Sequence, residues 1–180
     1  MRKLGLIIMA MALPLLGMSQ SIFDKYEDSE KIGTVTINKG MLKLAATVME
    51  HDEDEDTQQF VEIARSINNI KVFMSEDADA SADMNATMKK YVKSSKLEEL
   101  MKVRDGDTHV NFYIRNGKDD THVAELLMYV TGIDEKHHDK NGRNFETVLL
   151  TMTGDIDLTK VGSLTRKMKL HKGLNKLEEH

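Results

Sequence analysis

The side chains of this sequence that could bind a metal ion include two acidic groups. The first is the run from Asp52 to Asp56, and the second comprises Asp77, Asp79 and Asp83. Calcium loops of the EF-hand type hold several oxygen ligands at fixed spacings around a central glycine. Neither group has that spacing or that glycine, and charge runs are usually solvated. We therefore interpret the first group as an exposed loop and the second as polar residues around a helix start.

The histidines give the most ligand-like cluster, His137-His138 followed by Asp139. A zinc site needs three or four converging ligands, and the chain has neither a cysteine nor a His-x-x-x-His pair to complete such a set. His109 and His122 fall on neighbouring predicted strands, at positions that we expect to be far apart along the hairpin. We interpret these histidines as surface residues. Binding of calcium or zinc by converging loops remains the alternative hypothesis.

Residues for nucleophilic catalysis or nucleotide binding have no recognisable arrangement. The chain contains no cysteine and neither a Gly-x-Ser-x-Gly elbow nor a glycine-rich phosphate loop. We therefore predict no catalytic residue, no cofactor site and no metal site. The net charge is −5 without a basic stripe, which argues against nucleic acid as a partner.

The stretch from Phe145 onward is expected to organise the fold. Apolar residues alternate through Val148, Leu150 and Met152, which is the period of a β-strand. We expect Gly154 to end this strand. Asp157 is then expected to cap a closing helix, because one stripe of that segment is apolar. The stripe consists of Leu158, Val161, Leu164 and Met168.

The remaining elements follow from the same two periodicities. Strands are predicted at residues 33–38, 70–75, 100–104, 109–115 and 122–130, and helices at residues 39–49, 56–67 and 79–95. The helix at 39–49 has a broad apolar face and is expected to be well buried. Short connections make the last four strands an antiparallel meander. The fold class is therefore α+β, a mostly antiparallel sheet with helices packed on one face.

The N-terminal segment has the pattern of a secretory signal. Arg2 and Lys3 precede an apolar run from Leu4 to Leu16, which is too short to span a bilayer, and Ser19 is a suitable cleavage site. We predict a signal peptide over 1–19, a lead-in over 20–32, one domain over 33–169 and a polar tail over 170–180. The expected location is periplasmic or extracellular with no membrane span after cleavage. Without a cysteine the chain is not a Cys-anchored lipoprotein.

Several motifs, in this order, resemble those of a family of exported proteins typical of Bacteroidetes, catalogued as domain of unknown function 4252. The motifs are Phe23–Tyr26, Val35–Met41, Glu98–Gly106, Val110–Ile114, Glu125–Met128 and Val148–Leu158. The resemblance implies export and a Gram-negative envelope location. It implies no activity and no catalytic residues.

The outward side chains of the predicted hairpin form a mixed apolar and polar set. They are Asn111, Tyr113, Arg115, Leu127 and Tyr129. Such a mixture is typical of protein interfaces. We therefore expect a non-enzymatic protein-interaction module that binds a protein partner in the cell envelope through the sheet face or an edge strand. The alternative is a periplasmic protein that binds a small ligand or a metal ion. The sequence leaves the oligomeric state open.

Overall fold

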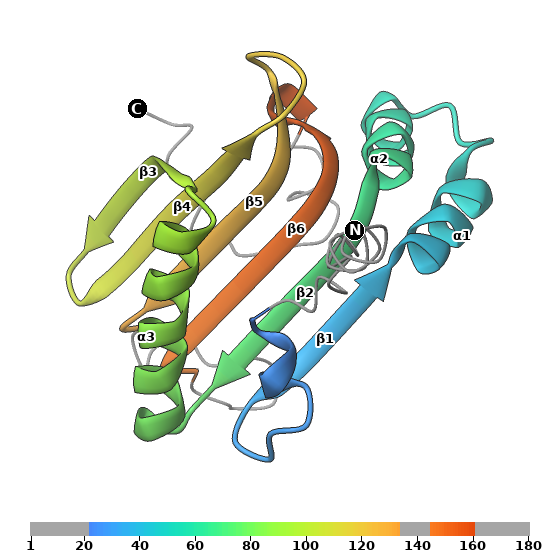
Figure 1. Ribbon diagram of the computed structural model, residues 1–180. Helices are drawn as coiled ribbons and strands as arrows, with labels where there is room; N and C mark the ends of the chain where they lie inside the picture. The colour runs from blue at the N-terminus through green and yellow to red at the C-terminus, as the bar shows by residue number, and fades with distance from the viewer. Residues whose placement is uncertain (1–21, 134–144, 161–180) are drawn as a thin grey trace, which may run out of the picture.

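The part of the chain that the structure describes forms one open antiparallel sheet with three α-helices (Figure 1). The computed structural model describes residues 22–133 and 145–160. In these ranges the strands are β1 (Gly33–Asn38), β2 (Ile67–Ser75), β3 (Glu98–Asp105), β4 (Thr108–Asn116), β5 (His122–Thr131) and β6 (Thr147–Asp157). The helices are α1 (Lys39–Met49), α2 (Glu55–Ser66) and α3 (Ala78–Ser94), with 3-10 turns η2 (Asp24–Tyr26) and η3 (Leu158–Lys160).

The strand order is β1-β2-β6-β5-β4-β3, and every neighbouring pair is antiparallel. The α+β class and the meander of the last four strands are thus confirmed. β6 joins that meander to the β1–β2 pair, so six strands of the sheet lie within the described ranges. None of the helices in the described ranges is long and apolar enough to cross a membrane.

Helix starts are set by short polar side chains that accept a backbone N–H of the first turn. Asn38 accepts from Met41 N for α1, Asp54 from Thr57 N for α2, and Asp77 from Ala80 N for α3. The bounds predicted for β1 and α1 are confirmed. α2 begins at Glu55, one residue before the predicted start at 56, because Asp54 supplies the capping carboxylate.

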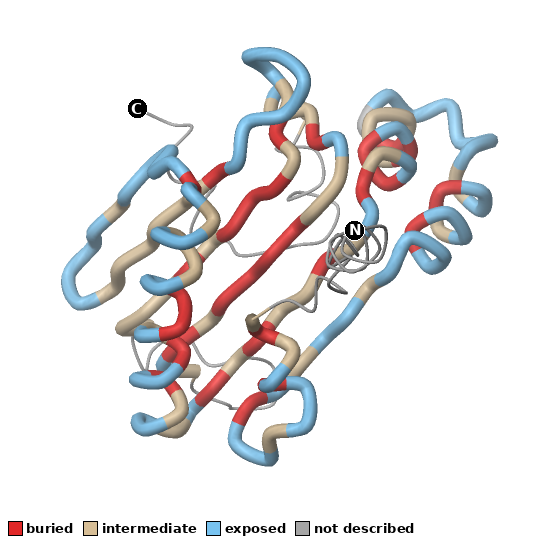
Figure 2. Tube along the Cα trace, in the orientation of Figure 1, coloured by how far each residue is buried: buried red, intermediate tan, exposed pale blue. Residues whose placement is uncertain are grey.

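Each face of the sheet carries its own apolar cluster (Figure 2). Successive residues of a strand point to opposite faces, so the neighbours Leu126 and Leu127 belong to different clusters. α3 packs with Leu127 and Leu149 on one face, which we call the α3 face. The α1–α2 hairpin contributes to the cluster with Leu126 and Leu150 on the other face. The prediction placed the helices on one face of the sheet. In the structure α3 packs on the α3 face, and the α1–α2 hairpin contributes to the cluster on the other face.

The described part of the predicted lead-in, residues 22–32, docks on the α3 face. Phe23 and Tyr26 are buried and their rings stack at 6.5 Å between centroids. Lys71 Nζ on β2 lies 2.6 Å from carboxylate oxygens of both Asp24 and Glu27. Charged and aromatic contacts together tie this segment to the sheet.

The prediction that Gly154 ends a strand is wrong. β6 continues through Gly154 to Asp157, and Gly154 pairs with Ile67 at a register shift of β2. Its φ is +153°, and a Cβ there would lie 2.5 Å from Ser66 O. Only glycine fits this close approach of the α2–β2 junction.

The closing helix was predicted to start after Asp157. Within the described residues, the Asp157 side chain accepts the Thr159 N–H at 2.9 Å, and a short 3-10 turn follows. Residues 161–168 of the predicted helix lie outside the described residues, as do the signal peptide over 1–19 and the tail over 170–180.

The expectation that α1 is well buried is also wrong. Leu42 and Ala46 are buried, whereas Met41, Leu44 and Val48 are exposed. α1 and α2 project together from one end of the sheet (Figures 1 and 2). One side of α1 packs against α2, and its other side is exposed.

Candidate functional site

The five residues predicted as an interaction surface all lie on the α3 face, but two of them belong to the core. Leu127 pairs with Tyr113 and Tyr129 pairs with Asn111 across β4 and β5. Leu127 and Tyr129 are buried, because α3 and the lead-in cover this part of the sheet. The proposal of a contact surface is therefore corrected to Asn111, Tyr113 and Arg115. The first two are half-buried and Arg115 is exposed.

A buried carboxylate lies directly beside this reduced surface. Glu125 on β5 is only 1% exposed. One of its oxygens accepts from Arg115 Nη2 at 2.6 Å, and Tyr91 Oη on α3 donates to the carboxylate at 2.8 and 3.0 Å. Burial, followed by the negative charge of Glu125, raises the pKa of Tyr91 to about 12. Sequence reasoning missed Glu125, although a lone acid in an otherwise apolar strand is itself a sign of a paired charge.

The three side chains form a closed network rather than a reactive one. The carboxylate already accepts from two donors, and the phenol stays protonated in the physiological range. We interpret the network as a device that fixes Arg115 at the border between α3 and the open part of the sheet. The exposed half of the Arg115 side chain is left available to solvent.

The open part of the sheet is the β3–β4 hairpin. All residues of β3 are exposed except the half-buried Val103. Leu100 and Met101 are among the exposed large apolar residues, at 48% and 40% of full exposure. The register shifts between Glu99 and Met101, so Leu100 has no residue opposite it in β4. This bulge at the sheet edge presents an apolar side chain to solvent.

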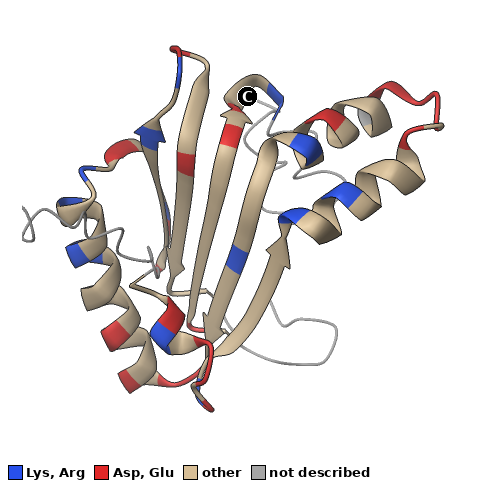
Figure 3. Cartoon of the chain, turned by 45° about the vertical axis from the view of Figure 1, so that its right-hand side comes forward, with Lys and Arg blue, Asp and Glu red and all other residues tan. Residues whose placement is uncertain are grey.

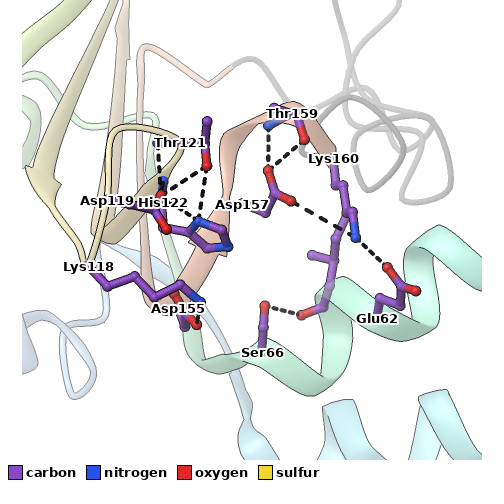
Figure 4. Close-up of polar contacts among 11 residues, drawn as sticks. Glu62, Ser66, Lys118, Asp119, Thr121, His122, Asp155, Asp157, Thr159 and Lys160 are labelled. Atoms are coloured by element: carbon purple, nitrogen blue, oxygen red, sulfur yellow. Dashed lines mark hydrogen bonds and ion pairs between the residues drawn. The ribbon is translucent and has the colours of Figure 1, made fainter.

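A second polar cluster lies where β5 begins and β6 ends (Figure 4). The Nδ1 atom of His122 lies 2.8 Å from Asp119 Oδ1 and 3.1 Å from Thr121 Oγ1. The hydrogen bond from His122, together with bonds from Thr121, lowers the pKa of Asp119 to about 2. The carboxylate also accepts the backbone N–H groups of both residues at 3.0 Å. These contacts are those of a tight turn between β4 and β5.

Two further ion pairs lie at this end of the sheet. One joins the turn to β6, and the other joins η3 to α2. Lys118 Nζ lies 2.7 Å from Asp155, and Lys160 pairs with Glu62 on α2. Asp157 stands opposite His122 in the β5–β6 register, but it bonds to Thr159. In the described ranges no group of three His, Cys, Asp or Glu residues could hold a metal ion. The contacts of this cluster hold together the end of the sheet where β5 begins and β6 ends.

The predicted metal-binding candidates do not converge where the structure describes them. Asp52 accepts the Asp54 backbone N–H, and the residues from Asp52 to Asp54 form part of the loop between α1 and α2 (Figure 3). The last two residues of the predicted loop, Glu55 and Asp56, are instead the first residues of α2. Asp77 caps α3, whereas Asp83 bonds to Lys25 and Tyr26. His109 pairs with Thr131 and His122 starts β5, so the two histidines lie at opposite ends of one ladder, as predicted. His137, His138 and Asp139 lie outside the described residues.

Comparison with known proteins places most of the chain in one family model. The model described as domain of unknown function (DUF4252) matches residues 26–164. Neither a curated protein nor a solved structure matches the chain. The matched range runs from η2 to beyond η3, and it includes every strand and helix described above.

Proposed function

This chain belongs to the family described as domain of unknown function (DUF4252). We propose that it is an exported envelope protein that binds a protein partner without catalysing a reaction. Three groups of observations support the proposal. They are the exposed β3–β4 hairpin, the Arg115 network at its border, and the signal-like N-terminal segment.

The exposed edge strand β3 is the observation that carries the proposal. An edge strand offers unpaired backbone N–H and C=O groups to another chain, and many peptide-binding domains use such an edge. β3 bears charges of both signs, at Glu99, Lys102 and Arg104, around the apolar pair Leu100 and Met101. A small apolar centre with a charged rim is the usual composition of a protein–protein interface.

The neighbouring strand β4 adds side chains on the α3 face of this edge, where Tyr113 stands opposite Glu99 and Asn111 opposite Lys102. Met101 stands opposite Phe112 and therefore lies on the other face. Asn111 and Tyr113 are half-buried beside α3, and Arg115 is held by Glu125 with its guanidinium at the surface. Tyrosine and arginine are enriched among residues that dominate binding energy. Because Arg115 also neutralises a buried carboxylate, a charge reversal there would change folding as well as binding. Leu100 is the better residue for a binding test.

The binding test compares capture of envelope proteins by the wild-type chain and by two variants. Leu100→Glu places a charge in the centre of the proposed surface, so we expect loss of a partner that crosslinks to the wild type. Leu44→Glu makes the same change at an exposed leucine of α1 and should leave that partner bound. Circular dichroism and the thermal midpoint establish that both variants are folded.

Two results would contradict the proposal. One is a partner retained by Leu100→Glu, which would exclude this surface. The other is the absence of any specific partner together with heat of binding on titration with calcium or zinc, which would favour the ligand-binding alternative. Export is tested separately by fractionating cells and sequencing the N-terminus, which we expect to begin at Gln20.

A further inference from the structure

Helix α1 carries a second apolar stripe that no other part of the described structure covers. Its inward stripe, Leu42 and Ala46 with the half-buried Met49, packs in the cluster beneath α2. Its outward stripe consists of Met41, Leu44 and Val48, all exposed, with Val48 at 75% of full exposure. The helices of soluble proteins usually place polar residues on the side that faces solvent. The outward stripe is the opposite of that pattern.

The spacing of the outward stripe is that of a helix-pairing seam. Met41, Leu44 and Val48 are separated by three and then four residues, which are the a and d positions of a heptad. The residues flanking the seam on the helical surface are Gly40, Ala45 and Thr47. They are small and uncharged, and small residues let a second helix approach closely. The outward arc of α1 is therefore free of charge along its length.

Charge is arranged instead along the axis of α1. Lys39 lies at the first position of the helix, where the helix dipole is also positive. The acidic run follows the C-terminal end with Asp52 and Glu53 (Figure 3), whereas Glu50 is paired with Arg65 of α2. If two copies of α1 pack antiparallel, the acidic end of each copy faces the basic end of the other. A parallel pair would bring two acidic runs together, which like-charge repulsion disfavours.

We propose that the outward stripe of α1 is a self-association surface on which a second copy of this chain binds through an antiparallel, two-fold α1–α1 contact. Such a contact is self-complementary, because the same patch serves both subunits. The seam is short, since eleven residues of helix span about 16 Å. Interfaces of this small size are typical of weak complexes. The association is therefore reversible and depends on concentration.

Sedimentation velocity of the mature chain, from Gln20 onward, between about 1 µM and 1 mM tests self-association. We expect the weight-average sedimentation coefficient to rise with concentration in the wild type. Leu44→Glu should weaken the association at least about tenfold, because it buries a charge in the seam. Leu100→Glu is the matched control, since Leu44 and Leu100 are exposed leucines at 60% and 48%. It should associate as the wild type does. A wild type that stays monomeric at every concentration, or equal effects of the two variants, would overturn the proposal.

The orientation is tested by disulfide crosslinking, for which the absence of cysteine gives a clean background. In an antiparallel pair, Met41→Cys in one copy lies near Val48→Cys in the other. A mixture of these two variants should therefore form the mixed disulfide on mild oxidation, in preference to either homodimer. Preferential formation of the 41–41 and 48–48 disulfides would indicate a parallel pair and contradict the charge argument.

These experiments are independent of the binding function proposed above. Leu44→Glu should lose self-association and keep the protein partner, whereas Leu100→Glu should do the reverse. Failure of one proposal therefore leaves the other standing.

Discussion

Arg115 and Glu125 stand directly opposite each other on β4 and β5, and Arg115 Nη2 donates to the buried Glu125 carboxylate at 2.6 Å. The two ends of this pair lie in different surroundings, because the Glu125 side chain is 2% exposed and that of Arg115 is 47% exposed. Tyr91 on α3 donates to the same carboxylate. One charged pair therefore links a helix, the centre of the sheet and the edge of the proposed binding surface.

Replacing Arg115 by Met should lower the free energy of unfolding by about 1–3 kcal/mol, because Glu125 keeps its burial and loses its cation. The loss is smaller than for a fully buried pair, since water screens the exposed guanidinium. The double variant Arg115→Met/Glu125→Gln should recover much of the loss, because no buried charge remains. Urea unfolding measures both values. An Arg115→Met variant as stable as the wild type would contradict this role.

Gly154→Ala should be clearly more destabilising than Gly106→Ala. Both glycines have positive φ, so both variants bear a conformational cost of about 1 kcal/mol. A Cβ at Gly154 would in addition meet Ser66 O at 2.5 Å, whereas nothing lies within 4 Å of one at Gly106. The midpoints of urea unfolding compare the two. Equal effects would show that the α2–β2 junction moves away at little cost.

The turn carboxylate Asp119 should stabilise the fold only when it is ionised. Its pKa in the folded protein is about 2, below the ordinary value of about 3.9. The stabilisation is therefore fully present above about pH 4 and is lost as the pH falls through 2. The thermal midpoint of Asp119→Asn should lie below that of the wild type at pH 5, and the difference should vanish toward pH 2.

The same prediction can be checked without unfolding the protein. The side-chain carbonyl carbon shift of Asp119 should titrate near pH 2 in the wild type. In His122→Gln the midpoint should rise toward its ordinary value, because the hydrogen bond from His122 is the largest cause of the shift. An unchanged midpoint in that variant would exclude His122 as the cause.

Two tyrosines should make the protein sensitive to alkali. Burial is the largest cause that raises the pKa values of Tyr91 and Tyr129 to about 12, above the ordinary value of about 10. Their contribution to stability is therefore full below pH 10 and is lost as the pH rises through 12. The absorbance of tyrosinate should rise in a step at this high pH. The amplitude of that step should be smaller in Tyr91→Phe than in the wild type, because one of the two tyrosines is then missing. A full titration of all four tyrosines near pH 10 would show that these side chains are accessible.

Local patterns predicted much of the chain without help from tertiary structure. The alternation in β1 and the polar residue before α1 gave both elements their observed bounds. Asp105-Gly106 predicted the turn between β3 and β4, where Gly106 has the positive φ that such turns require. The short connections of β3 to β6 predicted their meander for the same local reason.

The sequence by itself thus determined the class of fold, the order of the elements and the shared face of Asn111, Tyr113, Arg115, Leu127 and Tyr129, because periodicity acts between near neighbours. Only the tertiary structure decided which of these residues α3 covers, so Leu127 and Tyr129 became core residues. It likewise decided that Gly154 stays within a strand beside Ser66, and that the outer stripe of α1 faces solvent. Such outcomes depend on which distant segments pack together, and no local period contains that information.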